Sequence, residues 1–319
     1  MRLRRSGIVV AAGALLALAG AATWALAGND SPGGVAVPVV PPATARTGTP
    51  PPPPHGALVL ARGDRGLAVA LAARRAGSDV RLTATVLAPD GTGLRGLRVH
   101  FAVDGKATAA ATPCGPGCYA SRASRAAGAK RVSIDLSGGG RQRSAVSFAL
   151  PARWPVSALP LLRRAERAFR TLRSVAYREH LSSGAGVPID TLWRSEAPDR
   201  LTYRTTSGNA GVVIGRQRWD LVVGGGWKAS PQNPPLVLPA VPWGAGAYDV
   251  NLLGRGRVGG RAVVRLSLYE PTTPAWYAVT LDRATLRPLT VDMTATAHFM
   301  RDRYVSFNAP RQIRPPLGD

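Results

Sequence analysis

The two cysteines of this 319-residue chain, Cys114 and Cys118, lie four positions apart around Gly115-Pro116-Gly117. Such a segment turns tightly enough to bring the two Cα atoms within the ~4.4–6.8 Å that a disulfide needs. The alternative is a two-thiolate metal site, but tetrahedral zinc requires two further ligands, and His100 is the only histidine expected nearby. The sequence therefore favours a disulfide, which would contribute about 2 kcal/mol by the loop-entropy estimate.

A second pair with chemical potential is His298 and Met300. Two residues apart in an alternating segment, they share one face of a strand, whereas Met293 is expected on the opposite face. An imidazole and a thioether together suit Cu(I), so the pair is a weak candidate for a copper site. A half-buried strand with one methionine in the core explains the same residues and is the favoured interpretation.

Motifs for catalysis are missing from the sequence. It has no nucleophile elbow, no HExxH and no paired-carboxylate motif. Residues Gly254–Gly259 match GxGxxG, but a further strand-like segment follows them instead of the helix that a dinucleotide site requires. We expect a protein that is not an enzyme and that carries no cofactor.

Large apolar side chains are the remaining functional candidates, because six of the seven tryptophans fall after residue 151. Aromatic side chains at strand positions either fill a core or line a cavity for an apolar ligand. The candidates for such a groove are Phe169, Trp193, Trp219, Trp227, Leu238, Trp243 and Trp276.

The first 28 residues read as a signal anchor. Arg2, Arg4 and Arg5 precede an apolar run, Ile8–Ala27, that would be about 30 Å long as a helix and so would span a bilayer. This predicts a single-pass cell-membrane protein with a cytoplasmic N-terminus and an extracytoplasmic bulk, or a secreted one if cleavage occurs after Ala27. Residues 29–55 are a Pro-rich linker.

The net charge of +23 comes almost entirely from arginine, since only three cations are lysines. The favoured explanation is the codon bias of a GC-rich genome, and the alternative is attraction to an anionic surface such as phospholipid headgroups. The arginines are scattered and no nucleic-acid motif accompanies them, so we expect no nucleic-acid partner.

Residues 56–151 contain about seven short strand-like runs with turn residues between them, which predicts an immunoglobulin-like β-sandwich. The segments APDGTGL, VHFAVDG and TPCGPGCYAS resemble the YtkA-like domains of exported bacterial proteins. Some of those accompany membrane copper-transport proteins, so the resemblance implies a possible partner of that kind.

Residues 152–319 begin with the amphipathic helix Leu161–Leu172, preceded by Ser157 as a possible cap, and continue as a meander of about ten strands. The segments SVAYREHL, APDRLTYRTTSG, VVIGRQRWDL and LRPLTVDMTATAHFM resemble the LolA-like fold. That resemblance implies a curved antiparallel half-barrel packed on a helix around an apolar groove for a lipid or other apolar ligand. The apolar, Pro-rich segment Ser230–Trp243 interrupts the meander, and we hypothesise that its part Leu236–Trp243 lies over the mouth of the half-barrel.

Three functions follow from these observations. The favoured one is a non-enzymatic, membrane-anchored extracytoplasmic protein that binds a lipid or apolar ligand in the half-barrel. The alternatives are a copper-handling accessory protein of the cell envelope and a protein-interaction or envelope-sensing module.

Overall fold

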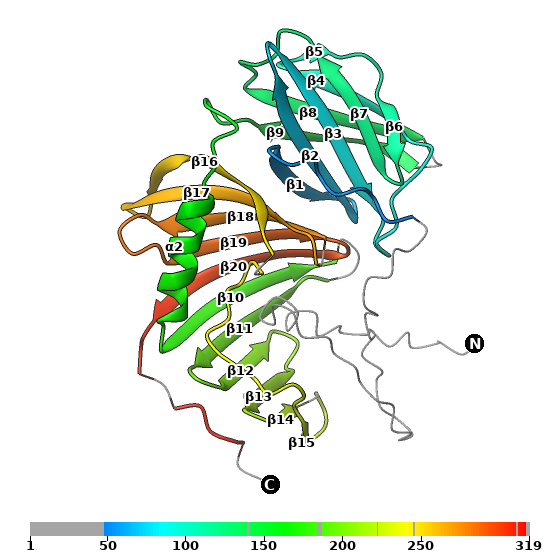
Figure 1. Ribbon diagram of the computed structural model, residues 1–319. Helices are drawn as coiled ribbons and strands as arrows, with labels where there is room; N and C mark the ends of the chain where they lie inside the picture. Colours follow the sequence, from blue (N-terminus) through cyan, green and yellow to red (C-terminus); the bar gives the residue numbers. More distant parts are fainter. Residues whose placement is uncertain are drawn as a thin grey trace, which may run out of the picture.

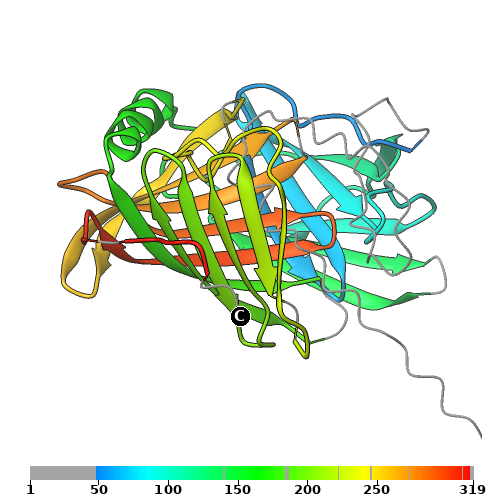
Figure 2. The same ribbon diagram turned by 90° about the horizontal axis from the view of Figure 1, so that it is seen from below.

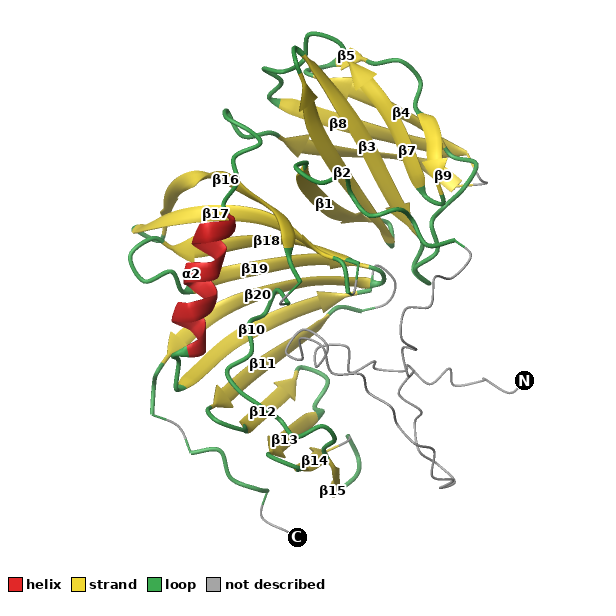
Figure 3. Cartoon of the chain, in the orientation of Figure 1, coloured by secondary structure: helices red, strands yellow, loops and turns green. Residues whose placement is uncertain are grey.

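The computed structural model describes residues 48–138, 141–183, 187–221, 223–244, 246–272, 274–310 and 312–316. These residues form a mainly β protein with a single α-helix, as Figure 3 shows. The predicted anchor, Ile8–Ala27, and most of the predicted linker lie outside the described residues. Within the described ranges, no helix combines the length and apolar character required to cross a bilayer.

Two antiparallel sheets form the first β unit, with strand orders β1-β2-β3-β7-β6 and β5-β4-β8-β9. Alternating apolar residues of both sheets, among them Leu71, Phe101 and Ile134, meet in one core, so the unit is a two-sheet sandwich. A closer relation to immunoglobulin-like or YtkA-like domains stays a prediction. Its strands are β1 (Leu58–Asp64), β2 (Leu67–Ala76), β3 (Asp79–Leu87), β4 (Arg98–Val103), β5 (Lys106–Ala107), β6 (Thr112–Gly115), β7 (Cys118–Ala123), β8 (Arg131–Gly138) and β9 (Arg141–Ala149).

The cysteines close the tight β6–β7 turn as a disulfide, with Cα atoms 5.0 Å apart. His100 lies on β4, in the other sheet, so it is not a third ligand beside them. Gly117 has a φ of +62°, and a Cβ at this position would come within 2.6 Å of the Gly93 Cα. The turn therefore requires a glycine there.

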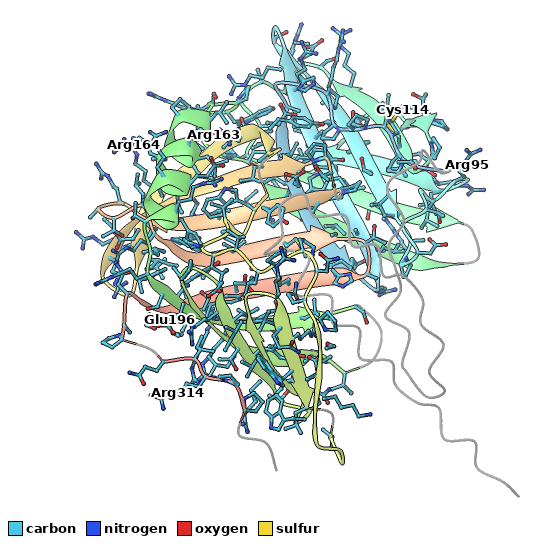
Figure 4. All side chains as sticks on the ribbon, turned by 60° about the horizontal axis from the view of Figure 1, so that its bottom comes forward. Arg95, Cys114, Arg163, Arg164, Glu196 and Arg314 are labelled. Atoms are coloured by element: carbon cyan, nitrogen blue, oxygen red, sulfur yellow. A yellow bond between two sulfur atoms is a disulfide. The ribbon has the colours of Figure 1, made fainter. Side chains whose placement is uncertain are left out.

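The helix α2 (Leu159–Arg170) buries Leu162, Ala165 and Phe169 along one side. This confirms the predicted apolar stripe. The cap was predicted wrongly, because Ala158 is the N-cap residue and no side chain caps the helix. Pro160 occupies the first turn, where a missing N–H leaves no hydrogen bond unmade. Arg164 projects from the exposed side of the helix at the margin of the molecule (Figure 4).

The second β unit is an antiparallel sheet of eleven strands in the order β15-β14-β13-β12-β11-β10-β20-β19-β18-β17-β16. Two meanders, β10–β15 and β16–β20, join where β20 pairs with β10, and the sheet curves around α2 (Figure 1). The strands are β10 (Ser174–Ser182), β11 (Ile189–Glu196), β12 (Arg200–Thr205), β13 (Ala210–Ile214), β14 (Gln217–Leu221), β15 (Trp227–Pro231), β16 (Tyr248–Val258), β17 (Arg261–Glu270), β18 (Ala275–Asp282), β19 (Pro288–Ala295) and β20 (His298–Phe307). We call this unit the half-barrel, and the face toward α2 its concave face.

The sandwich packs against the opposite, convex face of the half-barrel. Tyr269 and Trp276 join Val59, Ala70 and Leu87 of the sandwich in a separate apolar cluster. Two hydrogen bonds add to it, from Gly56 N to Asp249 Oδ1 (2.7 Å) and from Asn251 Nδ2 to Ala57 O (2.8 Å). The edge strand β1 is thereby covered, and Figure 2 shows the sandwich and α2 on different sides of the sheet.

Candidate functional site

The concave face carries one continuous apolar cluster. Four of the seven predicted groove residues meet there, namely Phe169 from the helix, Trp193 from β11, and Leu238 and Trp243 from the segment between β15 and β16. Phe169 contacts Trp243 edge-on, with ring centroids 6.4 Å apart. The structure therefore places these four residues on one apolar surface, and their role in a ligand groove stays a prediction.

Trp219, Trp227 and Trp276 do not belong to that surface. Asp220 accepts hydrogen bonds from Arg218 and from Tyr203, and Tyr203 lies on the concave face. Trp219 lies between Arg218 and Asp220 in the strand, so its side chain is directed to the opposite, convex face. Trp227 pairs with Leu221 and shares that orientation. Trp276 lies in the cluster that joins the two β units. These three predictions are wrong because strand alternation fixes relative orientation but does not say which face is concave.

The Pro-rich segment crosses the concave face. It connects β15 and β16, which are the two opposite edges of the eleven-stranded sheet, so its path must run over the sheet (Figure 1). The side chains of Leu238, Val241 and Trp243 are buried in the concave cluster, and Trp243 is 0% exposed. We call residues 232–244 and 246–247 the strap; it includes the segment Leu236–Trp243 that the sequence analysis expected over the mouth of the half-barrel.

Polar contacts fasten the strap along its length. At its first end, Leu236 N donates to Gly215 O (2.9 Å) and Leu238 N donates to Pro198 O (2.7 Å). In its middle, Trp243 Nε1 donates to Glu166 Oε1 at 3.4 Å. Arg163 Nη1 holds both oxygens of that buried carboxylate, at 2.9 and 2.8 Å.

A second buried carboxylate, Glu270, holds the far end of the strap. Its Oε2 accepts a hydrogen bond from Gly246 N (3.1 Å), and its Oε1 accepts one from Thr272 N (2.8 Å). Gly244 lies so close that a Cβ there would come within 2.4 Å of Glu270 Oε2. The strap is therefore latched to the helix at one point and to the end of β17 at another.

Beneath the strap, at the centre of the concave face, two further carboxyl groups lie side by side. Glu179 on β10 and Asp302 on β20 are directly opposite each other, and each residue is only 2% exposed. Residues so paired have Cβ atoms about 4.5–5.5 Å apart. Within the described residues, Glu179 Oε1, Asp302 Oδ1 and the neighbouring Trp193 Nε1 make no hydrogen bond. We call Glu179 and Asp302 the acid pair.

Burial raises both pKa values of the acid pair. Desolvation raises the pKa of Glu179 from 4.5 to about 7, although the nearby Trp193 indole lowers it in part. Desolvation also raises the pKa of Asp302 well above its ordinary value, and the adjacent Glu179 raises it further. The pair therefore keeps protons up to neutral pH, because two charges in an apolar interior are costly.

An aromatic wall surrounds the acid pair. Tyr177 stacks with Tyr304 (ring centroids 5.2 Å apart) and with Trp193 (6.2 Å), and Trp193 contacts Tyr203 at 5.0 Å. Burial raises the pKa of Tyr177 and Tyr304 well above the ordinary value, with Asp302 and Glu179 raising both further. The phenols are therefore neutral at any ordinary pH, and Glu179, with its pKa raised to about 7, is the group beside this wall that titrates near neutrality.

The strap side chains Leu238, Val241 and Trp243 are buried against the concave face. Two cavities lie elsewhere in the described ranges, one of about 430 Å³ beside Arg74 and Arg81 on the sandwich sheet that packs against the half-barrel, and one of about 410 Å³ on the convex face beside Ile313. The second lies under the C-terminal segment, on which Figure 4 marks Arg314.

The weak copper candidates stay a prediction. Met300 is buried, and His298 is half-buried with its Nδ1 3.0 Å from Thr296 O. Met293 pairs directly with Met300 and so shares its face, which corrects the sequence-based placement of Met293. No group of three or more histidine, cysteine or acidic residues able to hold a metal ion occurs in the described part of the chain.

The sequence analysis did not identify the acid pair, although the strand patterns contain a signal for it. Glu179 follows Val175 and Tyr177 in the buried phase of β10, and Asp302 lies between Met300 and Tyr304 in the buried phase of β20. An acidic residue in the buried phase of an alternating strand is the feature to look for. Their pairing was not visible, because it depends on β20 returning to β10.

No protein-family model matches this sequence, and no curated protein matches it. Several solved structures are similar over about half of the chain. Lipoprotein LppX of Mycobacterium tuberculosis (12% identity, TM-score 0.35) covers 49% of this chain and 97% of its own. LprF from Mycobacterium bovis (13% identity, TM-score 0.36) covers 50% of this chain and 96% of its own. A LolA superfamily protein from Nitrosomonas europaea (10% identity, TM-score 0.26) covers 49% of this chain and 95% of its own. At these scores the likeness assigns neither a family nor a function to the chain.

Proposed function

We propose that this protein is a non-catalytic binder of an apolar, lipid-like ligand, which it holds on the concave face of the half-barrel. The observation that carries the proposal is the strap. An apolar surface formed by α2 and the curved sheet is covered not by regular structure but by one irregular segment that contributes Leu238, Val241 and Trp243. We infer that these side chains occupy the place of the ligand and leave when it binds.

The free energy gained when the strap closes is similar in size to the free energy gained when a lipid binds in its place. Burying three large apolar side chains stabilises the closed strap by about 5–9 kcal/mol, at about 1.5–3 kcal/mol each. An acyl chain that buries a similar apolar area compensates for their loss. The polar attachments of the strap to Gly215, Pro198, Glu166 and Glu270 are single hydrogen bonds, each with a net contribution of about 1 kcal/mol. A lipid can therefore displace the strap without unfolding the sheet.

The cellular placement is part of the same proposal. We propose that Ile8–Ala27 anchors the chain in the cell membrane and that the sandwich and half-barrel lie outside it. The Cys114–Cys118 disulfide supports export, because such bonds persist in oxidising compartments.

A fluorophore on the strap tests the proposal. Both native cysteines are in the disulfide, so Val237→Cys, at a strap residue that is 75% exposed, provides a single labelling site for an environment-sensitive dye. The full chain in lipid nanodiscs is titrated with dodecanol. We expect a saturable change in emission as the strap leaves the concave face.

The matched control carries the dye at Val187→Cys, a site that is also exposed but lies in the β10–β11 connection. It should show no saturable change, because that connection lies outside the strap. Equal responses from both labels, or none from the strap, would refute the proposed function. A strap that never responds would favour the protein-interaction alternative.

A further inference from the structure

We propose that the acid pair, Glu179 and Asp302, is a recognition site for an amine, so that the ligand of the half-barrel is an amphiphile with a positively charged amino group. This inference rests on the proposed function, because it names the polar end of the apolar ligand. The first observation is that the acid pair has no cationic partner in a chain that is rich in cations. A chain of net charge +23 leaves two buried carboxyl groups at the centre of its concave face without a cation.

The arginines of the same two strands cannot supply that cation. Arg178, Arg301 and Arg303 alternate with the acid pair and are exposed on the convex face. Arg301 forms an ion pair there with Asp292. On the concave side, Arg163 is engaged by Glu166 and Arg218 by Asp220. A buried carboxylate normally has a partner, so the free oxygens of the acid pair indicate that the partner comes from outside the chain.

Unpartnered hydrogen-bonding atoms point in the same direction. Glu179 Oε1 and Asp302 Oδ1 are buried acceptors, and neither makes a hydrogen bond to any residue that the structure describes. The indole of Trp193, 3% exposed, lies beside the pair and lowers the pKa of Glu179, so it favours the charged carboxylate that an ammonium ion would meet. An ammonium group has three donors and no acceptor, and so it suits a pair of carboxyl groups.

The surrounding rings add a second element of amine recognition. Tyr177, Tyr304 and Trp193 are stacked in one row beside the acid pair. Aromatic faces attract cations within about 6 Å of the ring centroid, and the attraction is stronger where water is excluded. Carboxyl groups together with aromatic faces form a cage for an alkylammonium ion, whereas an anionic head group would be repelled.

Binding has a defined proton balance. The acid pair faces three phenols, Tyr177 of β10, Tyr304 of β20 and Tyr277 of β18. Two further carboxyl groups lie nearby: Glu270 of β17 is close to Tyr277, and Asp292 of β19 raises the pKa of Asp302. The three phenols stay neutral because burial raises their pKa values. When an alkylammonium ion enters, a carboxyl proton of the pair leaves to solvent and the amine keeps its own. An alcohol of the same chain length enters without releasing a proton.

The test compares dodecylamine with dodecanol at pH 7.5, using the full chain labelled at Val237→Cys in nanodiscs. We expect the amine to bind at least tenfold more tightly than the alcohol. We expect this ratio to fall at least tenfold in Glu179→Gln/Asp302→Asn, which keeps the shape of both side chains and removes their charge. Because wild type and variant are compared in the same discs, partition of the probes into lipid cancels.

The matched control is Asp135→Asn, which removes a half-buried carboxylate that is paired with Arg143 on the sandwich strand β8 and should keep the preference for amine. If the double variant does not fold, calorimetry of the wild type in two buffers with different ionisation heats decides the question. Proton release with dodecylamine but not with dodecanol supports the acid pair.

Equal affinities for the two probes, or an amine preference that survives in the double variant, would overturn this inference while leaving the proposed function intact. If neither probe moves the strap, the proposed function fails and the amine site fails with it.

Discussion

The pH dependence of stability gives a direct test of the acid pair. Glu179 is buried, and its pKa is raised from 4.5 in the unfolded chain to about 7 in the folded protein. Between these values the folded protein binds more protons than the unfolded chain, so its free energy of unfolding decreases as pH rises. The stabilisation by the neutral carboxyl group is complete below pH 4.5 and is lost as pH rises through about 7.

The size of this effect follows from the two pKa values. The difference between 4.5 and about 7 corresponds to about 3 kcal/mol, at about 1.4 kcal/mol per pH unit. Most of this decrease in the free energy of unfolding, about 2–3 kcal/mol, occurs between pH 5 and pH 8. Glu179→Gln removes this contribution and also lowers the pKa of Asp302, because Glu179 is one of the causes of its rise. Relative to wild type, the variant should therefore become more stable by at least about 2 kcal/mol as pH rises from 5 to 8.

Urea unfolding at pH 5, 6, 7 and 8, followed by tryptophan emission, measures this difference, because six of the seven tryptophans lie after residue 151. Asp135→Asn is the control, since its carboxylate lies in the sandwich, away from the acid pair, and is partly exposed and paired with Arg143; we expect its stability relative to wild type to change little with pH. A Glu179→Gln difference that stays constant from pH 5 to pH 8 would show that burial does not raise the pKa of Glu179.

Other parts of the fold give further predictions. Phe169→Ala should lower the free energy of unfolding by about 3–5 kcal/mol, as measured in urea, because the buried ring leaves a cavity under α2; a near-neutral effect would mean that the helix is not packed on the sheet. Trp276→Ala should cost a similar amount but leave dodecanol binding unchanged, because this ring joins the half-barrel to the sandwich; weaker binding would place it in the groove after all. Replacing Cys114 and Cys118 by serine should destabilise the sandwich by about 2 kcal/mol, seen as a lower melting temperature, and no shift would mean that the bond adds nothing. Trp243→Phe keeps an aromatic ring but removes the donor to Glu166, so amide hydrogen exchange in the strap should become faster while exchange in β10 does not change.

The sequence was sufficient for the local elements because their patterns are local. Period-two alternation in β10 to β20 predicted a meander, and the apolar stripe of α2 predicted a buried helix side. The glycines around Pro116 predicted the disulfide turn, since four residues of chain determine its geometry. The Pro-rich, apolar composition of the strap predicted a covering segment, and its residues Leu238 and Trp243 are buried in the concave cluster.

Only the tertiary structure decided which residues face the ligand surface. Both faces of the sheet are covered, by α2 and the strap on one side and by the sandwich on the other, so apolar residues occur in both phases of β18. Adjacent Trp276 and Tyr277 are both buried, in different clusters, and no local pattern tells them apart. The acid pair likewise exists only because β20 closes the sheet beside β10, which brings together two carboxyl groups that are distant in the chain. Periodicity specifies which side chains share a face, whereas long-range strand pairing specifies what that face meets.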